Sequence, residues 1–389
     1  MWAYVPSCGA VLADWGASVI KVEPPQGDPV RGMNFANIPP SPGGPFMAEL
    51  FNRGKQSVCL DLGVDAAHDI LMKMVDEADI FLVSLLPATR QRFGIGIEQI
   101  QARNPRIIYA CGTGQGALGE QTERGGYDAM TFWARGGISD ALTPADRALP
   151  IPMPTGAFGD SISGLVLAGG IAAAVAHRER TGEALVVEGS LLSTAMWAMQ
   201  ASIVAAGLLN ADAPPKINRS FTTNPLVFQY RTSDGRFLAL NMLQCDRYWP
   251  GFCEAIGRPD MATDPRFSTD HGRAENIEEC FRILDETFAS KTLAQWCEAL
   301  DRQPGQWDVL QRPGELRTDP QAVANGFIQS VDCGDGRQLE MIPAPMQFNH
   351  QTPTLRGAPR MGADTETVLH RLGLSEAEIA QAKSSGAMG

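Results

Sequence analysis

One aspartate near the middle of the chain, Asp160, stands where a carboxylate could act as a nucleophile. It lies in a Gly-Asp-Ser turn, and a nearly uncharged run, 162–176, follows it and ends in a basic segment before Thr181-Gly182. An acidic start, an apolar body and a basic end before glycine predict one long helix. A carboxylate beside the free N–H groups of a helix start is expected to stay ionised, which suits a nucleophile. The alternative is that Asp160 only caps the helix.

Basic residues in loops or at the ends of elements form a second candidate group. Arginine and lysine at such places can hold a phosphate through charge-assisted hydrogen bonds. The alternative for each one alone is solvated surface charge. These residues are Arg31, Arg53, Lys55, Arg90 and Arg92.

Tyr127 and Asp128 begin a predicted helix with the sequence YDAMTFWARGG. A tyrosine at a helix start can orient a polar group of a substrate, and the alternative is ordinary packing. Just before it, residues 114–119 match G-x-G-x-x-G after a predicted strand, as in dinucleotide-binding proteins. The polar residues 120–126 cannot form the apolar helix that should follow, so a nicotinamide-dependent oxidoreductase is a distant alternative.

The composition of the chain argues against several classes of protein. The chain has 389 residues and a net charge of −12, which argues against binding of nucleic acid or of an anionic membrane. Its eight cysteines form no C-x-x-C pair, and its five histidines form no H-x-x-x-H pair. We therefore expect no metal site and no disulfide framework, and a reducing cytoplasmic location.

Between Glu188 and Asp212 no residue is charged, a length that could span a bilayer. The segment contains several polar residues and its flanks are not basic. We expect a buried or subunit-interface helix there, with no membrane partner. The N-terminus carries no predicted secretory signal peptide.

The elements that must position these residues alternate between strand and helix in the first half. Strands are predicted at 18–23, 57–62, 79–85 and 106–111, helices at 8–17, 65–78 and 97–102, and a Gly/Pro-rich loop at 24–45. Such alternation predicts an α/β fold with a mostly parallel sheet.

The second half predicts a smaller domain. Residues 1–209 are the first part of the large domain, and the polar segment 210–225 is a predicted linker. Residues 226–315 form a predicted α+β domain, with a hairpin across 226–241 and helices at 246–256, 276–288 and 292–302. Residues 316–389 are expected to return to the large domain and to end in helices at 364–372 and from Ser375.

Taken in order, several blocks resemble the family III coenzyme A transferases, which include formyl-CoA, carnitine and bile-acid CoA-transferases. Among them are LADWGASVIKVEPPQGDPVRG (12–32), FNRGKQSVCLDL (51–62), RGGYDAM (124–130) and GAFGDSISGLVLAGGIAAAVAHRERTGEALVVEGSLL (156–192). The blocks extend over almost the whole chain.

The resemblance implies a Rossmann-like large domain, a smaller domain and two interlocked subunits of a homodimer. It implies that Asp160 attacks an acyl-CoA, forms an aspartyl-acyl anhydride and then an aspartyl-CoA thioester, and passes CoA to a free carboxylic acid. CoA thioester is then a substrate, and no tightly bound cofactor is expected.

The resemblance also places Gly126, Tyr127 and Asp128 near the substrate and Tyr127 near the thioester. It places the CoA nucleotide near Leu60–Gly63, Ser84–Leu86, Arg92 and Gly125–Asp128, to which we add Arg31 and Lys55 as phosphate-binding candidates. Ser84, Leu85 and Leu86 replace a more usual Asn-Phe-polar triplet, and Gly63 replaces a frequent lysine.

Two further expectations concern the start of the chain and the reaction. Relatives usually have a strand before the loop that here reads Tyr4-Val5-Pro6, so we expect a longer native protein. The rival within the fold is an α-methylacyl-CoA racemase, which needs two acid/base groups and has a Gly-His-Asp run. This chain has Gly126-Tyr127-Asp128, and tyrosine is a poor base at neutral pH, which favours transfer.

Overall fold

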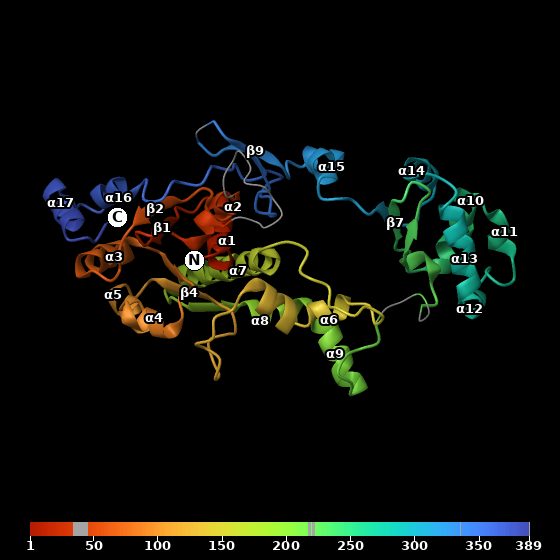
Figure 1. Ribbon diagram of the computed structural model, residues 1–389, viewed down its shortest axis with the longest axis horizontal. Helices are drawn as coiled ribbons and strands as arrows, with labels where there is room; N and C mark the ends of the chain where they lie inside the picture. The colour runs from red at the N-terminus through yellow and green to blue at the C-terminus, as the bar shows by residue number, and fades with distance from the viewer. Residues whose placement is uncertain (34–45, 217–218, 220–221, 335, 389) are drawn as a thin grey trace. The chain divides into compact units, whose positions relative to one another are not determined.

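The computed structural model describes residues 1–33, 46–216, 219, 222–334 and 336–388 (Figure 1). The contacts within the chain divide it into two units, Met1–Pro214 with Pro320–Gly389, and Pro215–Asp319. The first boundary lies inside the segment predicted as a linker, and the second lies at 319/320, where we expected 315/316. Parts of that linker and of the 24–45 loop lie outside the described residues.

Parallel strands organise the first unit. β1 pairs with β2 in one sheet, and β4 lies between β3 and β5 in another. The α/β prediction is confirmed, and four of these strands overlap predicted ones. β5 was not predicted, although Val186 and Val187 are β-branched residues typical of a strand. The strands are β1 (Ile20–Glu23), β2 (Gln56–Cys59), β3 (Ile80–Val83), β4 (Ile108–Thr113) and β5 (Val186–Ser190).

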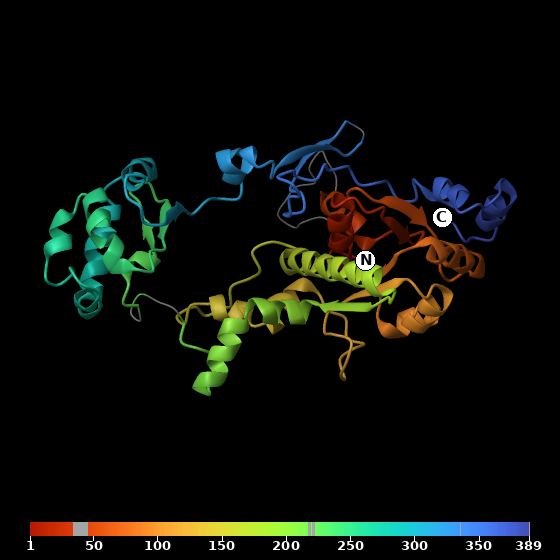
Figure 2. The ribbon, with the colours of Figure 1, turned by 180° about the vertical axis from the view of Figure 1, so that it is seen from behind.

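Helix α7 (Phe158–Thr181) is the long helix that the apolar run predicted, and it ends at Gly182 with φ 80°. Helix α1 (Tyr4–Asp14) packs along it (Figure 2). The expectation of a loop at residues 4–6 is wrong, because these residues form the first turn of α1. Pro6 is tolerated there since the first N–H groups of a helix have no partner within it.

The C-terminal helices of the first unit pack against its core. α16 and α17 bring the end of the chain onto the core formed by α3, α5 and the strands, where Val368 and Leu369 are fully buried. β9 and β10 form a separate antiparallel pair. The other elements are η1 (Pro29–Gly32), α2 (Phe46–Asn52), α3 (Asp65–Glu77), α4 (Pro87–Arg92), α5 (Ile97–Arg103), η2 (Ala129–Arg135), α6 (Ile138–Leu142), α15 (Pro320–Ala324), β9 (Gln329–Asp332), β10 (Gln338–Met341), α16 (Thr365–Arg371) and α17 (Glu376–Ser384).

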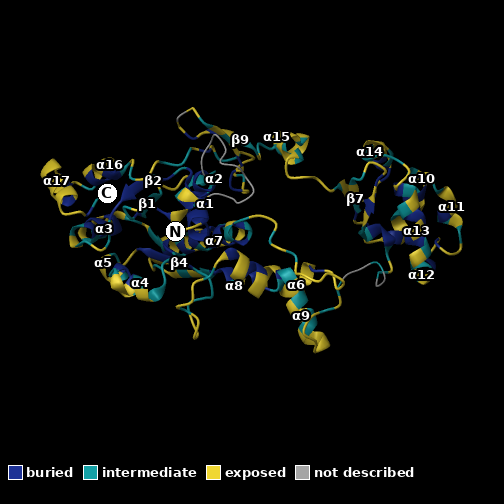
Figure 3. Ribbon diagram, viewed as in Figure 1, coloured by how far each residue is buried: buried dark blue, intermediate teal, exposed yellow. Residues whose placement is uncertain are grey.

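The uncharged segment after Glu188 forms two helices, α8 (Leu191–Ala198) and α9 (Gln200–Leu209), bent by 69° at the break. By length and composition α7 could cross a membrane, as could the bent pair if it were one span. α7 packs against α1 and β5, as the core helix of a globular unit does. α9 instead buries none of its residues within the chain (Figure 3).

The second unit combines a three-stranded antiparallel sheet with helices around a core of its own, in which Trp249 and Trp296 are almost fully buried. The predicted hairpin is present as β6 and β7, and the three predicted helices are α10, α13 and α14. The elements are η4 (Pro225–Val227), β6 (Gln229–Arg231), β7 (Phe237–Leu240), α10 (Cys245–Ala255), α11 (Pro259–Thr263), α12 (Asp270–Glu275), α13 (Ile277–Phe288), α14 (Leu293–Leu300), β8 (Trp307–Val309) and η5 (Glu315–Thr318).

A first prediction concerns the contact between α1 and α7. A Cβ atom at Gly164 would lie 1.8 Å from Ser7 Oγ and 2.9 Å from the backbone of α1, whereas one at Gly169 would meet nothing within 4 Å. We expect Gly164→Ala to destabilise the protein by about 2–3 kcal/mol through overpacking. Gly169→Ala in the same helix should stabilise it by about 0.5–1 kcal/mol. Urea unfolding of both variants tests this, and equal effects of the two substitutions would contradict it.

Candidate active site

Asp160 is the third residue of α7 and does not cap it. The residue before the helix, Ala157, has φ 58° and makes no side-chain capping bond. The backbone oxygen of Asp160 accepts a hydrogen bond of 3.2 Å from Ser7 on α1. The alternative that Asp160 serves only as an N-cap is therefore wrong, because its side chain lies within the first turn.

The start of α7 is held by another acidic side chain, Asp128, just before η2. Both carboxylate oxygens of Asp128 accept from the backbone N–H of Gly159, at 3.0 and 3.1 Å. Asp128 itself is buried. A Cβ at residue 159 would lie 2.2 Å from Phe132 and 2.5 Å from Asp128, so only glycine allows this approach. Asp128 thus supplies the cap that the helix lacks in its own sequence.

Burial and, after it, the negative charge of Asp128 raise the pKa of Asp160 to about 7. Our expectation that the helix start keeps this carboxylate ionised is corrected here, because desolvation and the like charge outweigh it. Asp160 is then close to half-ionised at neutral pH. A carboxylate with a pKa near the working pH is typical of catalytic groups.

The N–H groups of residues 159–161, at the start of α7, already have acceptors. Gly159 donates to Asp128, and Ser161 donates to the carbonyl of Ala157 at 3.0 Å. A hydrogen bond from the backbone N–H of Asp160 also lowers the pKa of Asp128, although burial raises it more. These N–H groups are therefore engaged within the protein.

Tyr127 and Gly126 lie directly before Asp128. The ring of Tyr127 is 57% exposed and stands edge-on to Trp2, with ring centroids 5.8 Å apart. Gly126 approaches Gly114 so closely that a Cβ on either would lie 2.6 Å from the other residue's Cα. This close approach brings the two ends of the 114–126 loop together. No helix starts between the G-x-G-x-x-G run and η2, so the helix of a dinucleotide-binding motif is missing there.

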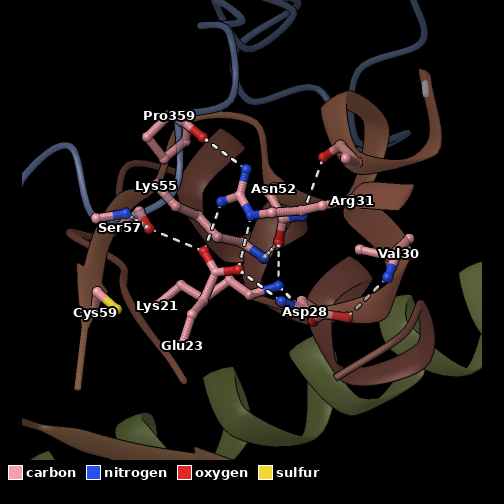
Figure 4. A network of polar contacts seen from close by, with 12 residues as sticks. Lys21, Glu23, Asp28, Val30, Arg31, Asn52, Lys55, Ser57, Cys59 and Pro359 are labelled. Atoms are coloured by element: carbon pink, nitrogen blue, oxygen red, sulfur yellow. Dashed lines mark hydrogen bonds and ion pairs between the residues drawn. The ribbon is translucent and has the colours of Figure 1, made fainter. Parts of the chain in front are cut away.

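Arg31 and Lys55 have partners inside the protein (Figure 4). Arg31 binds Glu23 through two hydrogen bonds of 2.5 and 2.7 Å, and Lys55 donates to the carbonyl oxygens of Pro6 and Phe51 at 2.8 and 2.6 Å. Burial lowers the pKa of Lys55 well below its usual range. Both side chains stabilise the packing around β1 and β2.

The other residues predicted to contact CoA follow the carboxyl ends of parallel strands. Leu60 follows β2 and is almost fully buried, and Ser84 and Leu85 follow β3. Arg92, at the end of α4, lines a pocket of about 670 Å³ together with Leu62, Gly63 and His68. Ligands in α/β folds bind beyond the carboxyl ends of strands.

Sequence reasoning missed the contacts that support the start of α7. Phe158 packs edge-on to Phe132 and Trp133, at 6.3 and 6.0 Å between ring centroids. Phe132 and Trp133 are separated from Phe158 by the 136–157 segment, so no regular spacing of apolar residues in the sequence predicts these contacts. Within the described residues, no cluster of three or more metal-ligating side chains is found.

Residues 1–365 match the sequence model of the family described as CoA-transferase family III. The chain belongs to this family. The chain is therefore a CoA-transferase, as the sequence blocks indicated.

Relatives and solved structures agree with the family. The chain is 31% identical over 383 residues to the (R)-2-hydroxy-4-methylpentanoate CoA-transferase of Clostridioides difficile, covering 98% of this chain and 94% of that protein. It is 30% identical over 386 residues to the cinnamoyl-CoA:phenyllactate CoA-transferase of Clostridium sporogenes, covering 96% and 91%. The crystal structure of Rv3272 from M. tuberculosis matches this CoA-transferase with a TM-score of 0.80 and 27% identity, covering 94% of this chain and 95% of that one.

A second prediction follows from the pKa of Asp160. Folding raises it from 3.8 to about 7, so the folded protein keeps a proton that the unfolded chain releases as the pH rises through this window. The free energy of unfolding therefore falls between these two values, and asparagine removes this fall. We expect Asp160→Asn to be more stable than the wild type at about pH 8 by about 1–2 kcal/mol, allowing for partial exposure of the carboxyl.

Urea unfolding at about pH 5 and about pH 8 measures this difference. Asp146→Asn, at an exposed position, is the matched control and should show no such pH dependence. A stability gain of Asp160→Asn that is the same at both pH values would contradict the prediction.

Proposed function

We propose that this CoA-transferase moves CoA from an acyl-CoA to a free carboxylic acid, with Asp160 as the nucleophile. The observation that carries the proposal is a carboxylate held in the first turn of α7 with its pKa raised to about 7. Each step exchanges one acyl bond for another, so the reaction conserves the energy of the thioester. The protein needs no tightly bound cofactor for it.

The first half of the reaction loads CoA onto the enzyme. An oxygen of Asp160 attacks the carbonyl carbon of the acyl-CoA, the C–S bond breaks, and CoA leaves as a thiolate from a mixed anhydride. The thiolate then attacks the aspartyl carbonyl of that anhydride. The donor acid leaves as a carboxylate, and an aspartyl-CoA thioester remains.

The second half runs the same steps in reverse. The acceptor carboxylate attacks the aspartyl thioester and releases the CoA thiolate, which gives a new mixed anhydride. The thiolate attacks the acceptor's acyl carbon, so the new acyl-CoA leaves and Asp160 is again a carboxylate. Tyr127, exposed beside Asp128, can orient the thioester through its hydroxyl.

For the CoA nucleotide we propose the pocket that Arg92 lines. An exposed guanidinium can pair with a phosphate, and Leu60, Ser84 and Leu85 lie just beyond the ends of β2 and β3. Arg31 and Lys55 already bind Glu23 and backbone carbonyls, so we assign them to shaping this region.

We further propose that the protein is an interlocked homodimer with a Rossmann-like large domain. Apolar side chains of α8 and α9 support this proposal, since Trp197 is 71% and Leu208 83% exposed in the single chain. Exposed large apolar side chains gathered on neighbouring helices are typical of protein interfaces. We place the enzyme in the cytoplasm, because its eight cysteines are free thiols.

A third prediction tests the reaction with a panel of acyl-CoAs and free acids that includes 2-hydroxy-4-methylpentanoate and phenyllactate. We expect CoA transfer by the wild type and a loss of at least about a thousandfold in Asp160→Ala, because the nucleophile is gone. Hydroxylamine added during turnover should give a hydroxamate at Asp160, located by peptide mass spectrometry. Full activity of Asp160→Ala would contradict the mechanism.

The same assay shows whether a substitution affects binding of the CoA nucleotide or the chemical step. It also distinguishes CoA transfer from racemisation. Arg92→Ala should raise KM for the acyl-CoA about tenfold with kcat unchanged, whereas Arg147→Ala, at an exposed position, should change neither. Exchange of the α-proton of a 2-methylacyl-CoA in D₂O without an acceptor acid would instead identify a racemase.

A fourth prediction concerns the dimer. Sedimentation equilibrium should give twice the mass of one chain. The double substitution Val204→Glu and Leu208→Glu on α9 should weaken association, because it places charge in an apolar interface. Leu118→Glu, at a residue 91% exposed in the 114–126 loop, is the control and should leave association unchanged. A wild-type protein that sediments as a single chain would contradict the proposal.

A further inference from the structure

Asp128 contacts the backbone at the start of α7. Its side chain is buried, and both of its oxygens lie 3.0–3.1 Å from the N–H of Gly159. The N–H of Asp160 adds a second backbone hydrogen bond to the same carboxylate. The buried carboxylate is therefore engaged with the start of α7.

Groups on the elements packed around the start of α7 do not compensate the charge of Asp128. On α1, burial raises the pKa of Tyr4 and that of Cys8, the latter to about 12, so both stay neutral at neutral pH. On η2, Arg135 donates to Gln115 and Gln121. The other titratable or charged groups of the elements packed against α7 are Asp14 on α1, Tyr109 and Cys111 on β4, and Glu188 on β5, and Tyr127 is exposed beside η2.

We propose that Asp128 is a positioning residue, which fixes the first turn of α7 through its backbone N–H groups and confronts Asp160 with a second negative charge. This inference rests on the proposed function of Asp160 as the nucleophile. It adds a residue that controls when and in which direction that nucleophile acts.

The order of ionisation follows from the hydrogen bonds. Two backbone N–H groups favour the charged form of Asp128. Burial and the charge of Asp128 raise the pKa of Asp160, and no hydrogen bond lowers it. Asp128 therefore ionises first, and Asp160 holds the proton at mildly acidic pH. Attack requires the ionised form of Asp160, so kcat/KM should fall as the pH drops through about 7.

A fifth prediction is the effect of Asp128→Asn, which keeps an acceptor oxygen for the helix start but removes the charge. We expect the acidic limb of the kcat/KM profile to move to lower pH by about one unit, because the like charge is gone while burial remains. KM for the acyl-CoA should stay within about twofold. Asp128→Ala, which also loses the acceptor, should lower kcat about a hundredfold, because the nucleophile is misplaced.

Infrared spectroscopy of the carboxyl groups reads the same effect without any substrate. The carboxyl that titrates near pH 7 should be absent in Asp160→Asn and should titrate at lower pH in Asp128→Asn. This measurement separates a failure of the inference from a failure of the proposed reaction. A folded Asp128→Asn with an unmoved titration, or with a raised KM and an unmoved acidic limb, would overturn the inference.

Discussion

The hydrogen bonds between the carboxylate of Asp128 and the first turn of α7 are the interaction on which the site depends. α7 begins after Ala157, which offers no side-chain oxygen, so the N–H of Gly159 needs an acceptor from elsewhere. Asp128 provides it from a segment 31 residues earlier in the chain. The same contact brings a second carboxylate to Asp160. The helix start is thus stabilised by a charge that opposes ionisation of the residue it positions.

This arrangement requires a glycine to lie tightly against a neighbouring segment at three places. Gly159 lies against Asp128 and Phe132, Gly164 lies against Ser7 and the backbone of α1, and Gly126 lies against Gly114. At each place a Cβ would be closer than 3 Å to its neighbour, so a larger residue forces the segments apart. Because α1 contacts α7 both at Gly164 and at the backbone oxygen of Asp160, changes in their packing displace the carboxylate. Close packing at Gly159 and the charge of Asp128 therefore both act on the first turn of α7.

The sequence predicted those helices and strands whose formation depends on a local pattern of residues. The apolar run after Asp160 predicted α7, Gly182 predicted its end, and the strand predictions overlap β1 to β4. The sequence could not predict the cap of α7, because Asp128 lies far from Gly159 along the chain. For the same reason Arg31 and Lys55 were predicted to bind phosphate. In the fold, Arg31 instead binds Glu23, and Lys55 donates to two backbone carbonyls. Local signals find the helix, and non-local contacts decide the ionisation of its first acidic residue.

The two carboxylates also affect the covalent intermediates that we propose. Free Asp160 is opposed by Asp128 when ionised, but an acylated Asp160 carries no charge, so formation of the anhydride or of the aspartyl thioester removes the repulsion. Asp128 then raises the free energy of the free carboxylate relative to every acylated state, for donor and acceptor acids alike. A carboxylate with a pKa near neutrality is also a stronger nucleophile than one near 4 and is still ionised in about half of the molecules. The two neighbouring carboxylates therefore favour loading of the enzyme without favouring either acid, as a reversible exchange between two carboxylic acids requires.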